Sequence, residues 1–286
     1  MIHTNFNKFE PFSLNQKEKY FFFFNEIKKL TNHHYTNSEE FKKILNFTNK
    51  KNNYKNLEDV PFLPIHLFKE YELMSVPKNK IFKTLNSSGT SGKKKSKIFL
   101  DSNNARNQQF VLSKILKTII GNKRLPMLII DKNPKNIYKS EISAKLVAIN
   151  GFSIFGREHS YLLNEKGEID YLNLNIFLEK YGNTNFLIFG FTSTVYENLF
   201  SKINLKNLKN NFSNGILIHG GGWKKMESIK VSNAEYKKKL FNKVKLKNIY
   251  NYYGLVEQTG SIFIECQYCN DLTTSIFSEV IIRDKY

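Results

Sequence analysis

Short apolar runs, each separated from the next by a stretch with helical periodicity, constrain the fold of this chain more than any other feature. Three such runs are Met127–Asp131, Phe186–Gly190 and Gly215–His219. Runs of this length without polar alternation are typical of strands that are buried on both faces of a parallel sheet. Between and after them, stretches such as Leu172–Tyr181 and Ala234–Lys243 carry apolar residues at helical spacing. The alternation predicts an α/β fold with a mostly parallel sheet flanked by helices.

The first 60 residues have a different pattern and are predicted to form a helical N-terminal region. Ser13 is the expected N-cap of a first helix, with Gln16 at its third helical position, and Ser38 starts a second helix. A polar linker follows at residues 49–56. Further helices are predicted at 103–120, 142–150 and 195–205, and further extended segments at 61–68, 248–254 and 261–265. We expect one large domain over residues 1–286, in which 61–286 form the α/β core.

Charge and hydropathy exclude several broad classes of protein. The net charge is +19, but the lysines are scattered and no helix-turn-helix, zinc finger or RNP-type motif accompanies them, so a dedicated nucleic-acid partner is not expected. No apolar run approaches the ~20 residues that a membrane span needs, and the N-terminus lacks the regions of a signal peptide. We therefore expect a soluble, cytoplasmic protein without a transmembrane segment.

The loop at residues 85–97 reads L-N-S-S-G-T-S-G-K-K-K-S-K and lies between two apolar extended runs. Glycines let a backbone turn tightly, hydroxyl groups add hydrogen-bond donors, and lysines add positive charge, a combination suited to polyphosphate. The spacing is not that of a Walker A motif, and a strand rather than a helix follows. The loop is predicted to be the tip of a β-hairpin over phosphates. A plain surface hairpin with a solvated basic tip is the alternative.

Two loops that follow predicted strands carry the remaining candidates for ligand contact. His219–Lys225 contains three consecutive glycines, which allow a flat ligand to approach the backbone closely; a tight turn is the alternative. Tyr253–Gly260 contains Glu257, a carboxylate that can hold Mg²⁺ on phosphates. The alternative for Glu257 is a favourable charge at a helix N-terminus.

Cys266 and Cys269 are the only cysteines and form one C-x-x-C. Half of a zinc site or a redox pair would explain this spacing. A zinc site needs two more ligands, and neither a second C-x-x-C nor an H-x-x-x-H is present. The pair also follows an extended run rather than opening a helix. Two ordinary reduced thiols are therefore the favoured interpretation.

The order of these motifs resembles the adenylate-forming (ANL) superfamily, which activates carboxylates with ATP. S-S-G-T-S-G, R-L-P-M-L-I-I-D, H-G-G-G-W-K-K and Y-G-L-V-E-Q-T-G-S-I are similar to motifs of the LuxE-type acyl-protein synthetase family, which is related to phenylacetate-CoA ligase type enzymes. The resemblance runs from about residue 11 to residue 284. It implies the large N-terminal domain of the adenylate-forming fold, with ATP and Mg²⁺ as cofactors.

The resemblance also implies a role for each matching residue. Phosphates of ATP would be held by Ser88, Gly89, Thr90, Ser91, Gly92 and Lys93, of which Thr90 and Lys93 would act in catalysis together with Glu257. Adenine would lie against Gly220, Gly221, Gly222, Tyr253 and Gly254. Glu257 would bind Mg²⁺. Acyl contacts would come from Phe191, Thr192 and Trp223.

The family's C-terminal lid domain, with its catalytic lysine and the acyl-accepting cysteine, is not matched by this sequence. The chain is expected to be a fragment, a truncated gene product, or a domain that another chain completes. The implied function is activation of a carboxylic acid, expected to be a fatty acyl group, for transfer to a protein thiol, with an acyl-donating or acyl-accepting protein as partner. A catalytically incomplete nucleotide- or acyl-binding module, or an acyl-CoA ligase-like fragment, is the alternative.

Overall fold

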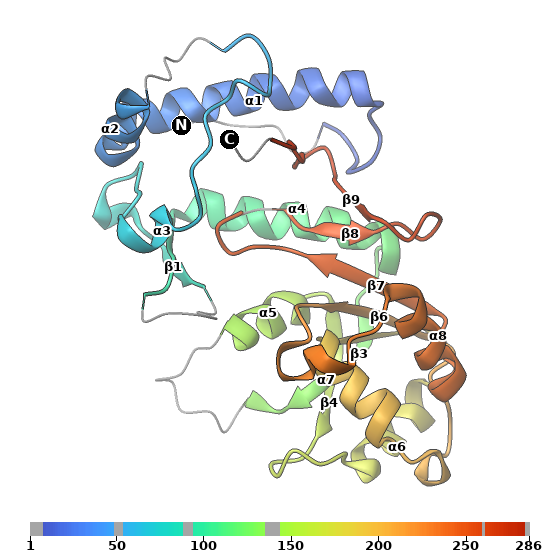
Figure 1. Cartoon of the computed structure of the whole chain (residues 1–286). Coiled ribbons are helices and arrows are strands. Elements are labelled where there is room, and N and C mark those ends of the chain that lie inside the picture. Colours follow the sequence, from blue (N-terminus) through green and yellow to red (C-terminus); the bar gives the residue numbers. More distant parts are fainter. Residues whose placement is uncertain (1–7, 49–53, 88–93, 135–143, 259–260, 284–286) are drawn as a thin grey trace. The chain divides into compact units, whose positions relative to one another are not determined.

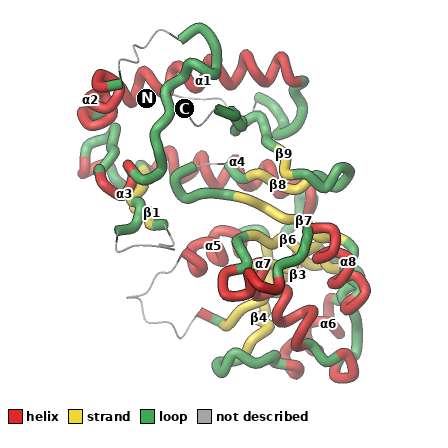
Figure 2. Tube along the Cα trace, in the orientation of Figure 1, coloured by secondary structure: helices red, strands yellow, loops and turns green. Residues whose placement is uncertain are grey.

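The computed structural model describes residues 8–48, 54–87, 94–134, 144–258 and 261–283. Their contacts divide the chain into two compact units. Unit 1 comprises residues 1–115, 254–263 and 274–286, and unit 2 comprises 116–253 and 264–273. Figure 2 distinguishes the helices, strands and loops of both units. The expectation of one large domain, in which a helical region ends at residue 60 and the α/β core begins at residue 61, stays a prediction.

Unit 2 is built on a sheet with the strand order β4-β3-β5-β6-β7-β8-β9 (Figure 1). Its strands are β3 (Leu125–Lys132), β4 (Gly156–Leu163), β5 (Phe186–Phe191), β6 (Gly215–Gly220), β7 (Asn248–Tyr253), β8 (Phe263–Glu265) and β9 (Leu272–Thr273). Every pairing from β4 to β7 is parallel, and β8 pairs antiparallel with β9. The predicted α/β fold with a mostly parallel sheet is therefore confirmed.

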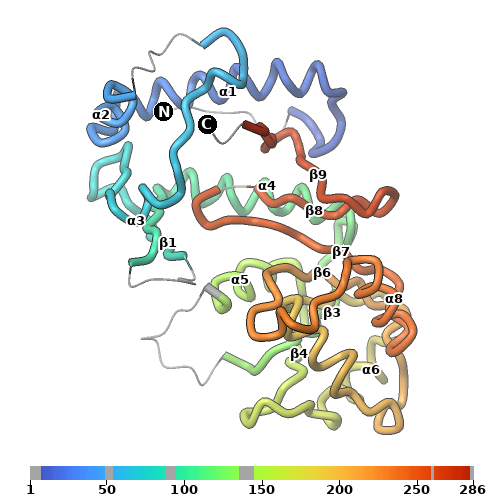
Figure 3. Tube along the Cα trace, viewed as in Figure 1, coloured from blue at the N-terminus to red at the C-terminus, as the bar shows by residue number. Residues whose placement is uncertain are grey.

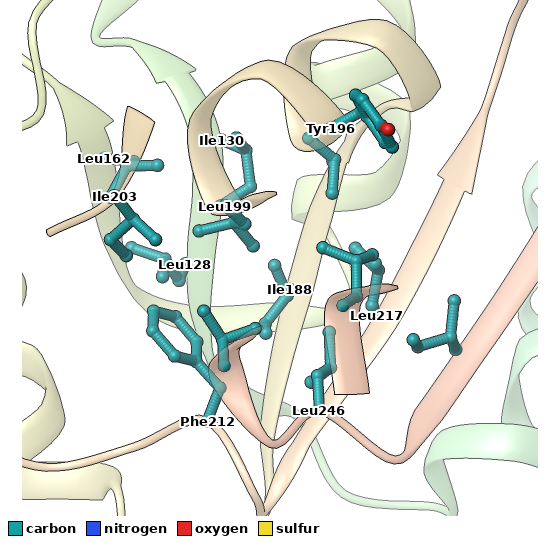
Figure 4. Close-up of a cluster of buried hydrophobic side chains, with 14 of the residues drawn as sticks. Leu128, Ile130, Leu162, Ile188, Tyr196, Leu199, Ile203, Phe212, Leu217 and Leu246 are labelled. Carbon is teal, nitrogen blue, oxygen red and sulfur yellow. The ribbon is translucent and has the colours of Figure 1, made fainter. Parts of the chain in front are cut away.

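Helices cover both faces of this sheet. They are α5 (Ala144–Ser153), α6 (Tyr171–Tyr181), α7 (Thr192–Val195), which continues as a π-helix over Tyr196–Lys202, and α8 (Asn233–Val244). On one face Phe152 of α5 stacks on Phe189 of β5, with ring centroids 4.3 Å apart. The other face carries the main core, in which Ile188 and Leu217 pack with Leu199 (Figure 4). Each fully buried side chain of this kind contributes roughly 1.5–3 kcal/mol to folding.

Two segments of unit 2 differ from the sequence-based expectation. Strand β4 was not predicted, because it is an edge strand whose middle residues are exposed and it has no continuous apolar run. Residues 195–205 were predicted to form one helix, but they divide into the end of α7, the π-helix and a short 3₁₀ turn at Leu205–Asn207. A further 3₁₀ segment covers Lys224–Ile229.

Unit 1 contains the helices α1 (Gln16–Asn37), α2 (Glu39–Phe47), α3 (Leu67–Glu70) and most of α4 (Ser102–Ile120), with a 3₁₀ turn at Lys78–Lys80. Ser38 caps α2 as predicted. The predicted cap of α1 is wrong: Asn15, not Ser13, caps this helix. Asn15 and Glu18 exchange hydrogen bonds in a capping box, which satisfies two free N–H groups, whereas Ser13 bonds to the carbonyl of Glu10.

Segments from both ends of the chain meet within unit 1 (Figure 3). The buried ammonium group of Lys19 in α1 lies 3.0 Å from the carboxylate of Glu279 and 2.5 Å from the hydroxyl of Thr274. The backbone N–H of Ile276 donates to the carbonyl of Pro11 at 2.8 Å. No helix among the described residues has the length and apolar content needed to cross a membrane.

Candidate functional site

The carboxyl edge of the unit 2 sheet brings together residues that the sequence analysis predicted in separate loops. Phe191 at the end of β5 pairs with Gly220 at the end of β6, and Gly220 pairs with Tyr252 of β7. Tyr253 ends the same strand. In sheets of parallel strands, ligands bind beyond this edge. The edge formed by β5, β6 and β7 is therefore the candidate site of unit 2.

Gly220 lies beneath the aromatic ring of Tyr252. A Cβ atom at position 220 would lie 2.5 Å from Cε1 of Tyr252 and 2.7 Å from its backbone oxygen, so only glycine fits. Tyr252 also packs against Phe152, with ring centroids 4.9 Å apart. Burial raises the pKa of Tyr252 to about 12, which keeps the phenol neutral at physiological pH. The packing of Tyr252 therefore explains why position 220 is a glycine. Contact between Gly220 and adenine stays a prediction.

Gly221 and Gly222 are exposed beyond the end of β6. Gly221 has a φ of +80°, a conformation that favours glycine, and a Cβ there would lie 3.2 Å from the ring of Phe191. A Cβ at Gly222 would meet no heavy atom within 4 Å. Open space beside exposed backbone is what a flat ligand needs. These two glycines, more than Gly220, fit the predicted nucleotide contact.

Two lysines that were not predicted as site residues lie near the ring of Phe191. The ammonium groups of Lys224 and Lys145 are 5.4 Å and 6.0 Å from its centroid. Lys145 is also 2.5 Å from the carboxylate of Asp131 near the end of β3. Lys224 has a φ of +51°. The positive charge of Lys224 favours an anionic ligand at this edge, whereas that of Lys145 is compensated by Asp131. The only signal for these lysines in the sequence was the position of Lys224 within the glycine-containing loop His219–Lys225.

The residues beneath the edge form a buried polar and aromatic layer. His219 Nδ1 lies 3.0 Å from the hydroxyl of Thr192, and the ring of His219 stacks on Tyr236 with centroids 4.6 Å apart. Burial, followed by the charge of Lys237, lowers the pKa of His219 to about 3, so the imidazole is neutral at physiological pH. This layer fixes the end of β5 to the end of β6.

Two predicted acyl contacts lie within this layer. Thr192 and Trp223 are each only 7% exposed. The indole of Trp223 packs edge-on against Tyr196 at a centroid distance of 4.9 Å. Phe191, the third residue predicted to contact the acyl group, is half-buried at the edge itself. Acyl contact by these three residues stays a prediction.

In unit 1, two paired strands lie on either side of the candidate phosphate loop in the sequence. Strands β1 (Lys83–Asn86) and β2 (Lys97–Leu100) pair antiparallel as predicted, and Ser87 and Ser96 are joined by two hydrogen bonds of 3.1 Å and 3.0 Å. The predicted contacts Ser88, Gly89, Thr90, Ser91, Gly92 and Lys93 lie outside the described residues. Directly after them, Lys94 bonds to Glu70 at 2.8 Å, and this bond lowers the pKa of Glu70.

Gly254 and Glu257 also belong to unit 1. Glu257 is half-buried in a turn that is closed by a 3.1 Å hydrogen bond from the N–H of Gln258 to the carbonyl of Leu255. A Cβ at Gly254 would lie 3.2 Å from Ile262. Within the described ranges, no three His, Cys, Asp or Glu side chains form a metal cluster. A single carboxylate fits Mg²⁺ that phosphate oxygens also bind, rather than an all-protein metal site.

The fold resembles that of solved ligases. 2-Hydroxyisobutyryl-CoA ligase in the postadenylation state, in complex with 2-HIB-AMP, matches with a TM-score of 0.65 at 12% identity, over 92% of this chain and 54% of the ligase. An open conformation of that ligase, in complex with 2-HIB-AMP and CoA, matches with a TM-score of 0.64 at 12% identity, over 92% and 55%. The chain thus spans about half the length of these structures, and the likeness confirms the expected fold.

A search of curated protein sequences found no match. A family model does match, that of the acyl-protein synthetase LuxE, and it covers residues 5–286. This range includes every candidate residue described above. The chain therefore belongs to the LuxE acyl-protein synthetase family.

Proposed function

We propose that this chain activates a carboxylic acid with ATP, giving an acyl-adenylate and pyrophosphate. Family membership and the fold shared with a ligase solved in complex with 2-HIB-AMP support this reaction. The observation that carries the proposal is the carboxyl edge of the unit 2 sheet. There the exposed backbone of Gly221 and Gly222 adjoins Phe191, and two lysine ammonium groups lie close to that ring.

In this reaction a carboxylate oxygen of the acid attacks the α-phosphorus of ATP in line. A new P–O bond forms, the bond to the bridging oxygen breaks, and pyrophosphate leaves. The protein supplies position and charge rather than a covalent intermediate. In the proposed arrangement Ser88–Lys93 hold phosphates, Gly221, Gly222, Tyr253 and Gly254 hold the adenine, and Glu257 holds Mg²⁺. When bound, Mg²⁺ neutralises charge on the phosphate oxygens.

The acid and the acceptor form the finer part of the proposal. We propose a fatty acyl substrate, a protein thiol as acceptor, and a cytoplasmic location, and family membership supports each of these. Phe191 is a half-buried aromatic side chain at this edge, and we propose that it contacts the acyl group. Thr192 and Trp223 are expected to support it from beneath.

Exchange of pyrophosphate into ATP, measured with a panel of carboxylic acids of different chain lengths, tests the reaction directly. We expect exchange with at least one acid, and its loss in Glu257→Ala without loss of folded structure. Glu227→Ala is the matched control, because Glu227 is an exposed carboxylate whose ion-pair partner is Lys230. Binding of ATP without exchange for any acid would reduce the chain to a nucleotide-binding module and would contradict the proposed activity.

A further inference from the structure

Both cysteines of the chain lie at the turn of the hairpin formed by β8 and β9 in unit 2 (Figure 1). The N–H of Cys266 donates to the carbonyl of Asp271 at 2.8 Å, and the N–H of Asn270 donates to the carbonyl of Cys266 at 3.0 Å. Asn270 has a φ of +62°, so the backbone reverses directly after Cys269. The C-x-x-C therefore closes a tight turn between two strands and does not open a helix.

A backbone N–H group of the turn donates to one of the two sulfur atoms. The backbone N–H of Tyr268 donates to Sγ of Cys266 at 3.4 Å. Donors of this kind stabilise a sulfur that carries negative charge, as a metal-bound thiolate does.

A buried carboxylate holds the base of the hairpin in place. Glu265, whose side chain is 1% exposed, lies 2.5 Å from the ammonium group of Lys237. It also accepts hydrogen bonds from the amide of Asn233 at 2.6 Å and from the backbone N–H of Asn251 at 2.8 Å. Lys237 bonds in addition to the side chain of Asn270 at 2.8 Å. Residues on both sides of the cysteines are thus fixed, while Cys269 is exposed and accessible to an ion.

We propose that Cys266 and Cys269 chelate a thiophilic d¹⁰ metal cation such as Zn²⁺. Two sulfur–metal bonds form, and each thiol releases one proton to solvent without any change of oxidation state. C-x₂-C is a ligand spacing found in zinc sites. No third His, Cys, Asp or Glu joins the pair in the part of the chain that the structure describes. Two coordination positions are therefore left to water, in contrast to closed structural zinc sites with four protein ligands.

The geometry favours metal binding over a thioredoxin-like redox role. Thioredoxin-like dithiols draw reactivity from the N-terminus of a helix, whereas these cysteines lie in a strand-to-strand turn. The proposed site also shares no residue with the ATP site, so failure of one proposal leaves the other standing.

Titration of the reduced chain with Cd²⁺ tests the site, because cadmium–thiolate bonds absorb in the near ultraviolet. We expect one Cd²⁺ per chain, displacement by Zn²⁺, and at least tenfold weaker binding in each of Cys266→Ser and Cys269→Ser. His33→Gln and His34→Gln, which alter neighbouring imidazoles in unit 1, are the controls and should bind as the unmodified chain does.

Three outcomes would overturn the proposal. The first is no thiolate absorption at a several-fold excess of Cd²⁺. The second is absorption that persists when both cysteines are replaced. The third is loss of both thiols to a disulfide in air while Zn²⁺ is in excess, measured by thiol counting, because a bound metal protects its thiolates from oxidation.

Discussion

At the scale of single residues, Gly220, Gly221 and Gly222 at the end of β6 differ in whether the structure requires a glycine, and why. Gly220 is required by the ring of Tyr252, which occupies the space that a side chain would need. Gly221 is required by its positive φ, and Gly222 by neither contact nor backbone conformation. Gly222 is therefore the position at which a side chain can probe a ligand without disturbing the fold.

Gly220→Ala and Gly222→Ala should affect different properties: the first the stability of the fold, the second the binding of ATP. Alanine at 220 must displace an aromatic ring and a backbone oxygen, and we expect it to destabilise the protein by about 1–3 kcal/mol. Alanine at 222 faces open space, so the free energy of unfolding should change by less than about 0.5 kcal/mol, while ATP binding weakens. Urea unfolding and equilibrium ATP binding measure the two effects. Unchanged ATP binding in Gly222→Ala would contradict the proposed adenine contact.

His219 should make the stability of unit 2 depend on pH. Its pKa is lowered to about 3 in the folded chain, against about 6.5 when unfolded. As the pH falls, His219 is therefore protonated in the unfolded state before it is protonated in the folded state. The contribution of the neutral imidazole to the free energy of unfolding is complete above pH 6.5 and is lost as the pH falls towards 3. One proton gives a slope of about 1.4 kcal/mol per pH unit.

Urea unfolding at pH 7, 6 and 5 measures this slope, and the fluorescence of Trp223, the only tryptophan, reports unit 2. His219→Gln should flatten the dependence. His34 in unit 1, whose pKa burial and then His33 lower to about 4, supplies the control: His34→Gln should leave the Trp223 transition unchanged. Equal slopes in the unmodified chain and His219→Gln would contradict the neutral buried imidazole.

At the scale of elements, helix α1 and the segment that follows β9 are joined by a buried ion pair. Lys19 and Glu279 have side chains that are 8% and 15% exposed. Removal of one buried partner leaves the other charge without compensation, which costs far more than the loss of an exposed pair. This pair therefore holds two segments of unit 1 that are distant in the sequence.

Lys19→Met should lower the free energy of unfolding by about 3 kcal/mol. The matched control is Lys43→Met, which breaks an exposed pair with Glu39 in α2 and should cost less than about 1 kcal/mol. Thermal unfolding of both variants measures the difference. Equal shifts of the melting temperature would show that the Lys19 pair is no stronger than a surface pair.

At the scale of the whole molecule, the residues predicted to bind ATP come from both units. Ser88–Lys93, Gly254 and Glu257 belong to unit 1, and Gly220–Gly222 and Tyr253 belong to unit 2.

Hydrogen–deuterium exchange with and without ATP and Mg²⁺ tests this division. We expect protection by nucleotide at residues 86–97 and 254–258 in unit 1 and at 219–222 in unit 2. The turn at Cys266–Cys269 should exchange at the same rate in both conditions. Protection confined to one unit would contradict the ATP contacts predicted for the other.

The sequence by itself determined the parallel strands, the antiparallel pairing of β1 with β2 and the family. Each of these depends on local pattern: continuous apolar runs, glycine and lysine spacing, and the order of motifs. Only the tertiary structure decided that Tyr252 fills the space over Gly220, that Trp223 is buried, and that Lys145 and Lys224 flank Phe191. It also placed Cys266 and Cys269 in a turn held by Glu265. These contacts join residues far apart in the sequence, and no local pattern records which side chain will occupy a given space.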